Sequence, residues 1–302
     1  MQQLATVRQN TDTPALAQIL DTISATQWNC TTASLTHGIY TACGGTRTAH
    51  LFDLATFVEF YVIGTMILDD VVERHTIRMD TPSIHARYGM PRAIIAGTYL
   101  IHKGFAIIAP YRLHQIERID RVYDGWITKD TEFGKSAEAC SAALRNLGHS
   151  YGAFTALAAE LAGADTDTIR VIHDAFCDIG YAREIIEELK DLRGDFHREP
   201  AAELQSGEDI FVIVTAQELG IPIDKHRAWH SIENTPAHYH VIRHAHTALD
   251  RGIQTLMNAV PSVMQNTTVD AIIRDLQKNV HRYGAHDTPP VPSSPTRTCP
   301  PL

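Results

Sequence analysis

The chain has 302 residues, 44% of them hydrophobic, and its 26 Lys and Arg against 35 Asp and Glu give a formal charge of −9. Nucleic-acid binding needs clustered basic residues, so nucleic acid is not an expected partner. The five cysteines form no Cys-x-x-Cys pair, which favours a cytoplasmic protein over a disulfide framework or a Cys-rich zinc site. No run of 18 apolar residues and no signal-like N-terminus occurs, so we expect neither a transmembrane segment nor secretion.

Several segments have the length and composition of helices. Residues 51–73 are mostly apolar and contain a single Gly and no Pro, and residues 136–161 are rich in Ala, the best helix former. Pro91 suits the first turn of a helix over residues 90–108, and Asp165 or Thr166 suits the cap of a helix over residues 166–192. Further helices are predicted over residues 208–219, 239–259 and 269–282. Alternating strand patterns are missing, so the sequence predicts an all-α bundle.

The two ends of the chain differ from this helical body. Residues 1–13 are mostly polar, and we expect a flexible N-terminus there. From Pro289 onward, six of the last fourteen residues are proline, which can neither continue a helix nor build a core. The sequence therefore predicts one all-α domain over residues 14–285 and a Pro-rich, disordered tail over residues 286–302.

Two groups of acidic residues stand out on long helices. The first acidic motif is Asp69, Asp70 and Glu73, at the end of the apolar helix over residues 51–73. The second acidic motif repeats the same spacing with Glu187, Glu188 and Asp191. Carboxylates that project together repel one another unless a cation joins them, and Mg²⁺ prefers such oxygen ligands. The pair of motifs predicts a Mg²⁺ site that binds a diphosphate, with solvated helix surfaces as the alternative.

At these residues the sequence resembles the trans-prenyl diphosphate synthases (the polyprenyl synthetase family) and the class I terpene synthases that share their fold. Residues 44–47 (GGTR) look like the family's GGKR, and residues 68–89 look like its first DDxxD with the RRG and Pro-x-x-His that follow. Residues 93–100 look like AIxAGDxL, and residues 176–195 look like the helix of the second DDxxD. The resemblance covers residues 40–283 and implies an isoprenoid-synthase helical bundle around a central cavity.

The basic residues with which elongating family members hold isopentenyl diphosphate are mostly replaced. By position, the substitutes for that family patch are Thr46, Ala49, Val62 and Met79. Charge-assisted hydrogen bonds hold diphosphates, so these substitutions predict that the isopentenyl diphosphate site is lost. Two further family lysines are matched by His149 and Glu208.

The resemblance and its departures imply a Mg²⁺-dependent class I terpene synthase, a lyase that ionises farnesyl or geranylgeranyl diphosphate and releases diphosphate and a terpene. One alternative is a trans-prenyl diphosphate synthase that adds isopentenyl diphosphate to an allylic diphosphate. Another is a prenyltransferase that uses a different acceptor. The non-enzymatic alternative is a regulatory subunit of a heteromeric synthase. The resemblance also implies a homodimer.

The resemblance assigns roles to particular residues. Roughly three Mg²⁺ ions per site are implied, with the ligands Asp69, Asp70, Glu73, Glu187, Glu188 and Asp191. Catalysis is assigned to Asp69, Asp70 and Arg78. The diphosphate-binding residues are Arg47, Arg78, His149, Arg198, Arg282 and Tyr283. The prenyl-chain pocket is assigned to Phe60, Tyr61, Gly64, Thr65, Tyr99, Phe154 and Tyr181. Core packing is the alternative for the aromatic residues, and a helix contact is the alternative for Gly64.

Overall fold

The computed structural model describes residues 7, 9, 13–26, 28, 30–119, 121–124, 135–195, 204 and 210–284. The predicted Pro-rich tail lies outside these residues, and so does most of the predicted flexible N-terminus. Arg198 and Glu208 also lie outside them.

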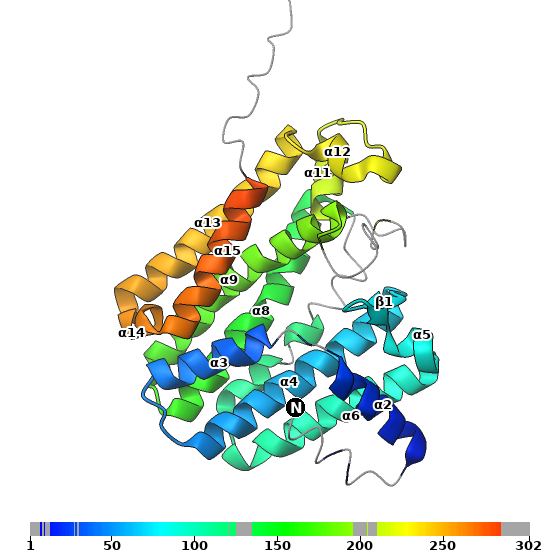
Figure 1. The fold of residues 1–302 in the computed structure, drawn as a ribbon. Helices are drawn as coiled ribbons and strands as arrows, with labels where there is room; N and C mark the ends of the chain where they lie inside the picture. Colours follow the sequence, from blue (N-terminus) through cyan, green and yellow to red (C-terminus); the bar gives the residue numbers. More distant parts are fainter. Residues whose placement is uncertain are drawn as a thin grey trace, which may run out of the picture.

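The described chain is helical apart from one short hairpin, which confirms the predicted all-α class (Figure 1). The α-helices are α2 (Pro14–Ala25), α3 (Thr31–Ala42), α4 (Thr48–Val72), α5 (Ile84–Tyr88), α6 (Met90–Ile108), α8 (Ala137–Ala162), α9 (Thr166–Arg193), α11 (Phe211–Glu218), α12 (Ala228–Ile232), α13 (Pro236–Ala259), α14 (Pro261–Gln265) and α15 (Thr267–Tyr283). The remaining elements are the 3-10 turns η1 (Ala109–Tyr111), η2 (His114–Ile119) and η3 (Lys225–Arg227) and the strands β1 (Ile77–Arg78) and β2 (Thr81–Pro82).

Local signals account for several helix boundaries. Helix α6 spans the predicted residues, with Pro91 in its first turn. The Asp165 side chain accepts the Thr168 N–H at 2.9 Å and caps α9. Helices α2 and α3 were not predicted. The sequence of α3 is rich in Thr and contains Ser and Gly, which are poor helix formers, and its packing against α4 and α8 stabilises it instead.

The long helices pack side by side in the bundle. Helix α9 lies between α8 and α13, while α4 packs along α6, and α3 contacts both α4 and α8. One large hydrophobic cluster joins α3, α4, α8, α9 and α13. A second, smaller cluster joins α2, α4 and α6. Gly148 on α8 meets Gly180 on α9, and Gly64 on α4 meets Gly97 on α6, so each helix pair touches through backbone atoms where a side chain would not fit.

Two helical segments, Thr48–Val72 and Met90–Tyr111, are long and apolar enough to cross a membrane by composition alone. Half of the apolar window of the first and 39% of that of the second are buried inside the protein. A buried core helix of a soluble protein has the same composition, so the expected absence of a transmembrane segment stays a prediction.

Both acidic motifs lie near the C-terminal ends of their helices. In Figure 1, α4 and α9 both run from lower left towards the right, so these two ends lie on the same side of the bundle. The β1–β2 hairpin follows α4 directly, and α11 follows α9. Two acidic helix ends that are 118 residues apart in the chain thus lie on one side of the bundle.

Candidate active site

The first acidic motif combines one accessible carboxylate with two buried ones. Asp70 is only 2% exposed and Glu73 is also buried, whereas the Asp69 side chain is 38% exposed. The residues that precede these acids on α4 pack into the two hydrophobic clusters. The acids therefore lie at the end of an otherwise apolar helix. Buried carboxylates need a compensating charge or hydrogen bonds.

Arg78 supplies that charge to the first motif. Its Nε donates to Asp70 Oδ1 at 2.9 Å, its Nη2 donates to the same oxygen, and Nη2 lies 3.7 Å from Asp69 Oδ2. The β1–β2 hairpin positions Arg78, with Met79 and Asp80 as its two turn residues, both at positive φ. Such a turn forms a tight two-residue hairpin, so Arg78 folds back onto the helix that precedes it.

His75 is a further neighbour of the first motif that the sequence interpretation missed. Its Nδ1 lies 3.2 Å from Glu73 Oε2 and 3.9 Å from Asp70 Oδ1, and the ring is buried. The backbone N–H of His75 donates to the Asp70 carbonyl at 3.0 Å. Sequence spacing does not predict this contact, because it depends on the tight turn that follows α4, where Arg74 has φ = 59°.

The second acidic motif has a different charge environment. Asp191 is 1% exposed, and the buried Glu188 accepts the backbone N–H of Phe211 at 3.2 Å through Oε2. Glu187 is more accessible and has two cations nearby. Lys190 Nζ lies 3.3 Å from its Oε1, and Arg183 Nη2 lies 3.7 Å from the same atom.

Arg282 and Tyr283 lie beside the second motif but are already paired. The Tyr283 hydroxyl donates to Asp195 Oδ2 at 2.5 Å, and Arg282 Nη2 lies 3.2 Å from that oxygen. Asp195 follows Gly194, which ends α9 in the left-handed conformation at φ = 82°. Burial, followed by the hydrogen bond to Asp195, raises the pKa of Tyr283. The structure thus ties the end of α15 to the end of α9, near the predicted diphosphate region.

Arg47 lies at the opposite end of α4 from the first motif. It is the N-cap residue, its N–H donates to the Tyr40 hydroxyl at 3.1 Å, and that hydroxyl donates to its carbonyl at 3.3 Å. With a rise of 1.5 Å per residue, Arg47 and Asp69 are about 33 Å apart. Arg47 is therefore not close to the acidic residues, and its predicted role in diphosphate binding stays a prediction. Thr46 and Ala49 lie at the same distant end, so they carry no information about a second diphosphate site near the acids.

His149 also lies away from the second motif. Gly148, the neighbour of His149, contacts Gly180 on α9. His149 therefore lies about 10 Å from Glu187 along the axis of that helix. Its ring centroid is 6.3 Å from that of His173, and burial followed by the charge of Arg121 lowers the pKa of His149. The assignment of His149 to diphosphate binding is not supported by these neighbours.

Arg145 is a cation that the sequence interpretation missed. It lies over the Tyr181 ring, 4.0 Å from the centroid, one turn closer than His149 to the end of α8 that faces the second motif. The Tyr181 hydroxyl lies 2.6 Å from Ser141 Oγ and 3.0 Å from His244 Nδ1, so this ring is held by polar contacts between α8 and α13. These contacts place the Tyr181 hydroxyl in a polar network, while its buried ring belongs to the large hydrophobic cluster.

The other predicted pocket residues fall into two groups. Tyr61 and Phe154 belong to an aromatic cluster in the large core, with ring centroids 5.4 Å apart, together with Phe57 and Phe105. Phe60 and Tyr99 belong instead to the smaller cluster shared with α2 and α6. Gly64 and the buried Thr65 complete the set. A Cβ on Gly64 would lie 2.7 Å from the Gly97 carbonyl oxygen, so Gly64 is a helix contact. The Thr65 hydroxyl donates to the Val62 carbonyl at 2.9 Å.

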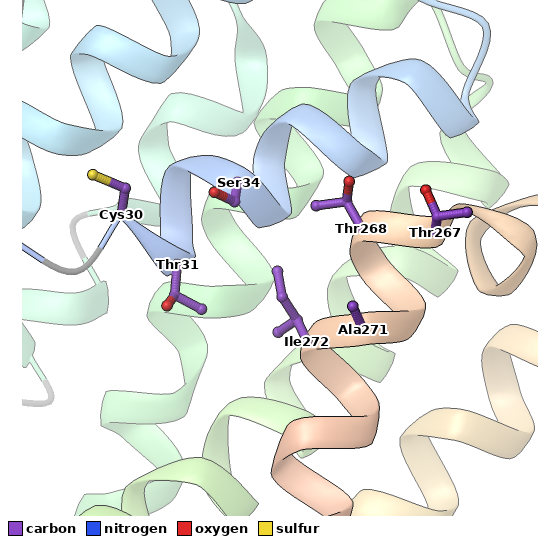
Figure 2. Close-up of a pocket in the computed structure, with 7 residues that line it drawn as sticks. All are labelled: Cys30, Thr31, Ser34, Thr267, Thr268, Ala271 and Ile272. Carbon is purple, nitrogen blue, oxygen red and sulfur yellow. The ribbon is translucent and has the colours of Figure 1, made fainter.

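A shallow cavity of about 470 Å³ lies elsewhere, between α3 and α15 (Figure 2). Its lining residues are small or of moderate size: Cys30, Thr31, Ser34, Thr267, Thr268, Ala271 and Ile272. This cavity contains no residue of either acidic motif, so it is not part of the candidate active site.

The donor atoms of the two motifs suit Mg²⁺, which takes one or two carboxylates from a protein and completes its shell with water and substrate phosphates. Among the described residues, no three His, Cys, Asp or Glu side chains form a ready-made site for one ion. The residues that would hold Mg²⁺ are the accessible Asp69 and Glu187 and the buried Asp70, Glu73, Glu188 and Asp191, whose carboxylates fit the group chemically.

Comparisons with known proteins identify the family. The polyprenyl synthetase family model matches residues 14–249, and the chain belongs to this family. The geranylgeranyl diphosphate synthase of Sulfolobus acidocaldarius is 24% identical over 174 residues, which cover 51% of this chain and 53% of that protein. The geranylfarnesyl diphosphate synthase of Natronomonas pharaonis is 23% identical over 189 residues, which cover 56% and 55%. The matched part thus spans about half the length of these relatives.

Solved structures show the same fold. A decaprenyl diphosphate synthase from Rhodobacter capsulatus superimposes with a TM-score of 0.75 at 16% identity, covering 90% of this chain and 94% of that one. The geranylgeranyl pyrophosphate synthetase of the archaeon Geoglobus acetivorans gives a TM-score of 0.75 at 15% identity, with coverage of 93% and 94%. The named relatives are prenyl diphosphate synthases, so the comparisons favour prenyl transfer, the alternative of the sequence interpretation, over a terpene synthase.

Proposed function

We propose that the protein is a Mg²⁺-dependent prenyltransferase of the trans-prenyl diphosphate synthase type. It would bind an allylic prenyl diphosphate between the two acidic motifs and lengthen it with isopentenyl diphosphate. The observation that carries this proposal is the placement of the two motifs at the ends of α4 and α9 on one side of the bundle, with Arg78 folded onto the first. The family membership supports the same conclusion.

The mechanism follows from the charges at this site. Bound Mg²⁺ would act as a Lewis acid that stabilises the negative charge of the departing diphosphate. Asp69 and Asp70 would hold the metal, and Arg78 would bind the leaving diphosphate through charge-assisted hydrogen bonds. The aromatic cluster of Tyr61, Phe154 and their neighbours excludes water from the apolar part of the bundle, and its ring faces would stabilise a cationic prenyl group.

A terpene synthase remains the second candidate function, because two substitutions near the first motif still favour it. Met79, next to Arg78 in the hairpin, and Val62, partly buried on α4 against the large core, carry no charge where the family resemblance expects isopentenyl diphosphate ligands. A site without these donors binds a second diphosphate weakly.

One incubation distinguishes the two functions. Geranyl, farnesyl and geranylgeranyl diphosphate are each supplied with Mg²⁺, with and without isopentenyl diphosphate, and both the organic extract and the diphosphate esters are analysed by mass spectrometry. The proposed function requires longer prenyl diphosphates that form only when isopentenyl diphosphate is present. A hydrocarbon or terpene alcohol from a single prenyl diphosphate would instead establish the terpene synthase. If no substrate reacts, transfer to a different acceptor or the regulatory-subunit alternative takes precedence.

The homodimer and the cytoplasmic location belong to the same proposal. Helix α6 leaves Ile94 and Ile95 exposed, 46% and 64% respectively, and Met90 at its start is exposed as well. An apolar helix face of this kind suits contact with a second copy. Light scattering on the purified chain would test it, and Ile95→Glu should shift a dimer towards the monomer.

A further inference from the structure

Arg183 gives the second acidic motif a cation of its own on the same helix. It lies one turn before Glu187 on α9, and its Nη1 donates to Glu184 Oε1 at 3.0 Å. Its Nη2 lies 3.7 Å from Glu187 Oε1, and its guanidinium lies over the Tyr151 ring of α8, 5.1 Å from the centroid. The guanidinium thus has Glu184, Glu187 and the Tyr151 ring as neighbours. The side chain is 33% exposed, so it is also accessible to solvent.

The arrangement parallels the first motif. There, Arg78 pairs with Asp70 and Asp69, and here Arg183 pairs with Glu187 and Glu184. A metal ion that binds the Glu187 carboxylate shares its negative charge, so the attraction between Glu187 and Arg183 weakens. The guanidinium that is released has a planar fork of donors, whose geometry matches a phosphate group.

The other two acids of the second motif differ from Glu187 in their burial. Glu188 is buried and accepts the Phe211 N–H, and Asp191 is almost fully buried. Glu187 is therefore the member of the motif that couples an accessible carboxylate to an arginine. Lys190, at 3.3 Å, can remain beside Glu187 when Arg183 leaves.

We propose that Arg183 is a diphosphate-binding residue that stays beside Glu187 until Mg²⁺ and diphosphate bind together. This proposal rests on the proposed function. In the resting protein, Arg183 donates to Glu184 at 3.0 Å and lies 3.7 Å from Glu187, which also has Lys190 at 3.3 Å. When the Glu187 carboxylate turns to the metal, the Arg183 guanidinium turns to the diphosphate, and both charges keep a partner. Metal and diphosphate binding are then coupled, since each ligand alone weakens the ion pair and the two together replace it.

The test is isothermal titration of the full chain with Mg²⁺ alone and with inorganic diphosphate in saturating Mg²⁺. The variants are Arg183→Gln, Arg183→Lys and a matched control, Arg170→Gln. Arg170 lies on the same helix and pairs with Asp167 and Asp174 at exposed positions, so its loss removes the same charge far from the motif. Circular dichroism and melting curves check that each variant is folded.

The expected changes for Arg183→Gln have opposite signs. Mg²⁺ alone should bind several-fold more tightly, because Glu187 has lost a competing partner. Diphosphate in the presence of Mg²⁺ should bind roughly tenfold or more weakly, because a charge-assisted hydrogen bond is missing. Arg183→Lys should recover part of the diphosphate affinity, and Arg170→Gln should change neither value.

A purely structural role for Arg183 would weaken both bindings together or change neither, and either result overturns the inference. The proposed function fails separately. If the unaltered protein binds no diphosphate with Mg²⁺, the diphosphate site and the inference are both wrong. If it binds and turns over prenyl diphosphate while Arg183→Gln retains full diphosphate affinity, only the inference is wrong.

Discussion

Replacing Asp70 with Asn separates the structural role of the first acidic motif from its predicted role in metal binding. The change keeps the size and one acceptor oxygen of the side chain but removes its charge. Asp70 is almost fully buried, and Arg78 donates two hydrogen bonds to its Oδ1. The variant therefore leaves a largely buried guanidinium opposite a neutral amide, with the Asp69 carboxylate 3.7 Å away.

The size of the effect follows from this burial. Breaking a buried ion pair by removing one partner costs about 3–5 kcal/mol. The Asn oxygen keeps a hydrogen bond that contributes about 1 kcal/mol, so we expect Asp70→Asn to lower the free energy of unfolding by about 2–4 kcal/mol. Each kcal/mol lowers the Tm of a domain of this size by about 1.5–2 °C. The same variant should lose prenyl diphosphate turnover, because the predicted metal ligand is missing.

The assay is a double-mutant cycle with Arg78→Gln, followed by thermal and urea denaturation, together with diphosphate release from farnesyl diphosphate. The coupling energy between the two changes should be about 1–3 kcal/mol. Asp69→Asn is the matched control: Asp69 is partly exposed and 3.7 Å from Arg78, so its loss should cost less than about 1 kcal/mol and still stop turnover. Additive effects of Asp70→Asn and Arg78→Gln would refute the ion-pair argument. Full turnover in EDTA or in both Asp variants would refute the metal-binding argument.

Three further predictions test other parts of the structure. Gly64→Ala places a methyl group 2.7 Å from the Gly97 carbonyl oxygen, so it should destabilise the protein by about 1–3 kcal/mol in a thermal melt; an unchanged Tm would mean that α4 and α6 can separate freely. Burial lowers the pKa of His173, so the unfolded chain binds more protons near its ordinary pKa and stability should fall as the pH drops below about 6.5. Urea unfolding at several pH values measures this slope, and His173→Asn should flatten it. Burial raises the pKa of Cys177 to about 12, so its thiol should resist a disulfide reagent at pH 8 until the protein unfolds, and rapid labelling of the native chain would contradict its placement.

The helical elements could largely be predicted because their signals are local. Apolar composition and a Pro in the first turn defined α6, and Asp165, one of the two predicted caps, caps α9. Helix α3 could not be predicted, because its Thr-rich sequence has low helix propensity and its stability comes from α4 and α8. The β1–β2 hairpin was missed for a related reason: its turn residues, Met79 and Asp80, are not the Gly or Asn that usually mark positive φ.

The candidate site, like the fold, could be predicted only in part from the sequence. The spacing within each acidic motif could be read from the sequence, because 3.6 residues per turn fixes which side chains of one helix lie together. Distances between segments could not be read from the sequence: Arg47 was assigned to diphosphate binding, and only the structure shows that the length of α4 separates it from the first acidic motif. The partners Arg78–Asp70 and Tyr283–Asp195 were decided by the hairpin and by the packing of α15 against α9. The sequence by itself determined the helical class and the two acidic motifs, whereas only the tertiary structure decided which cations face them, because those contacts join residues whose separation along the chain carries no information about their separation in space.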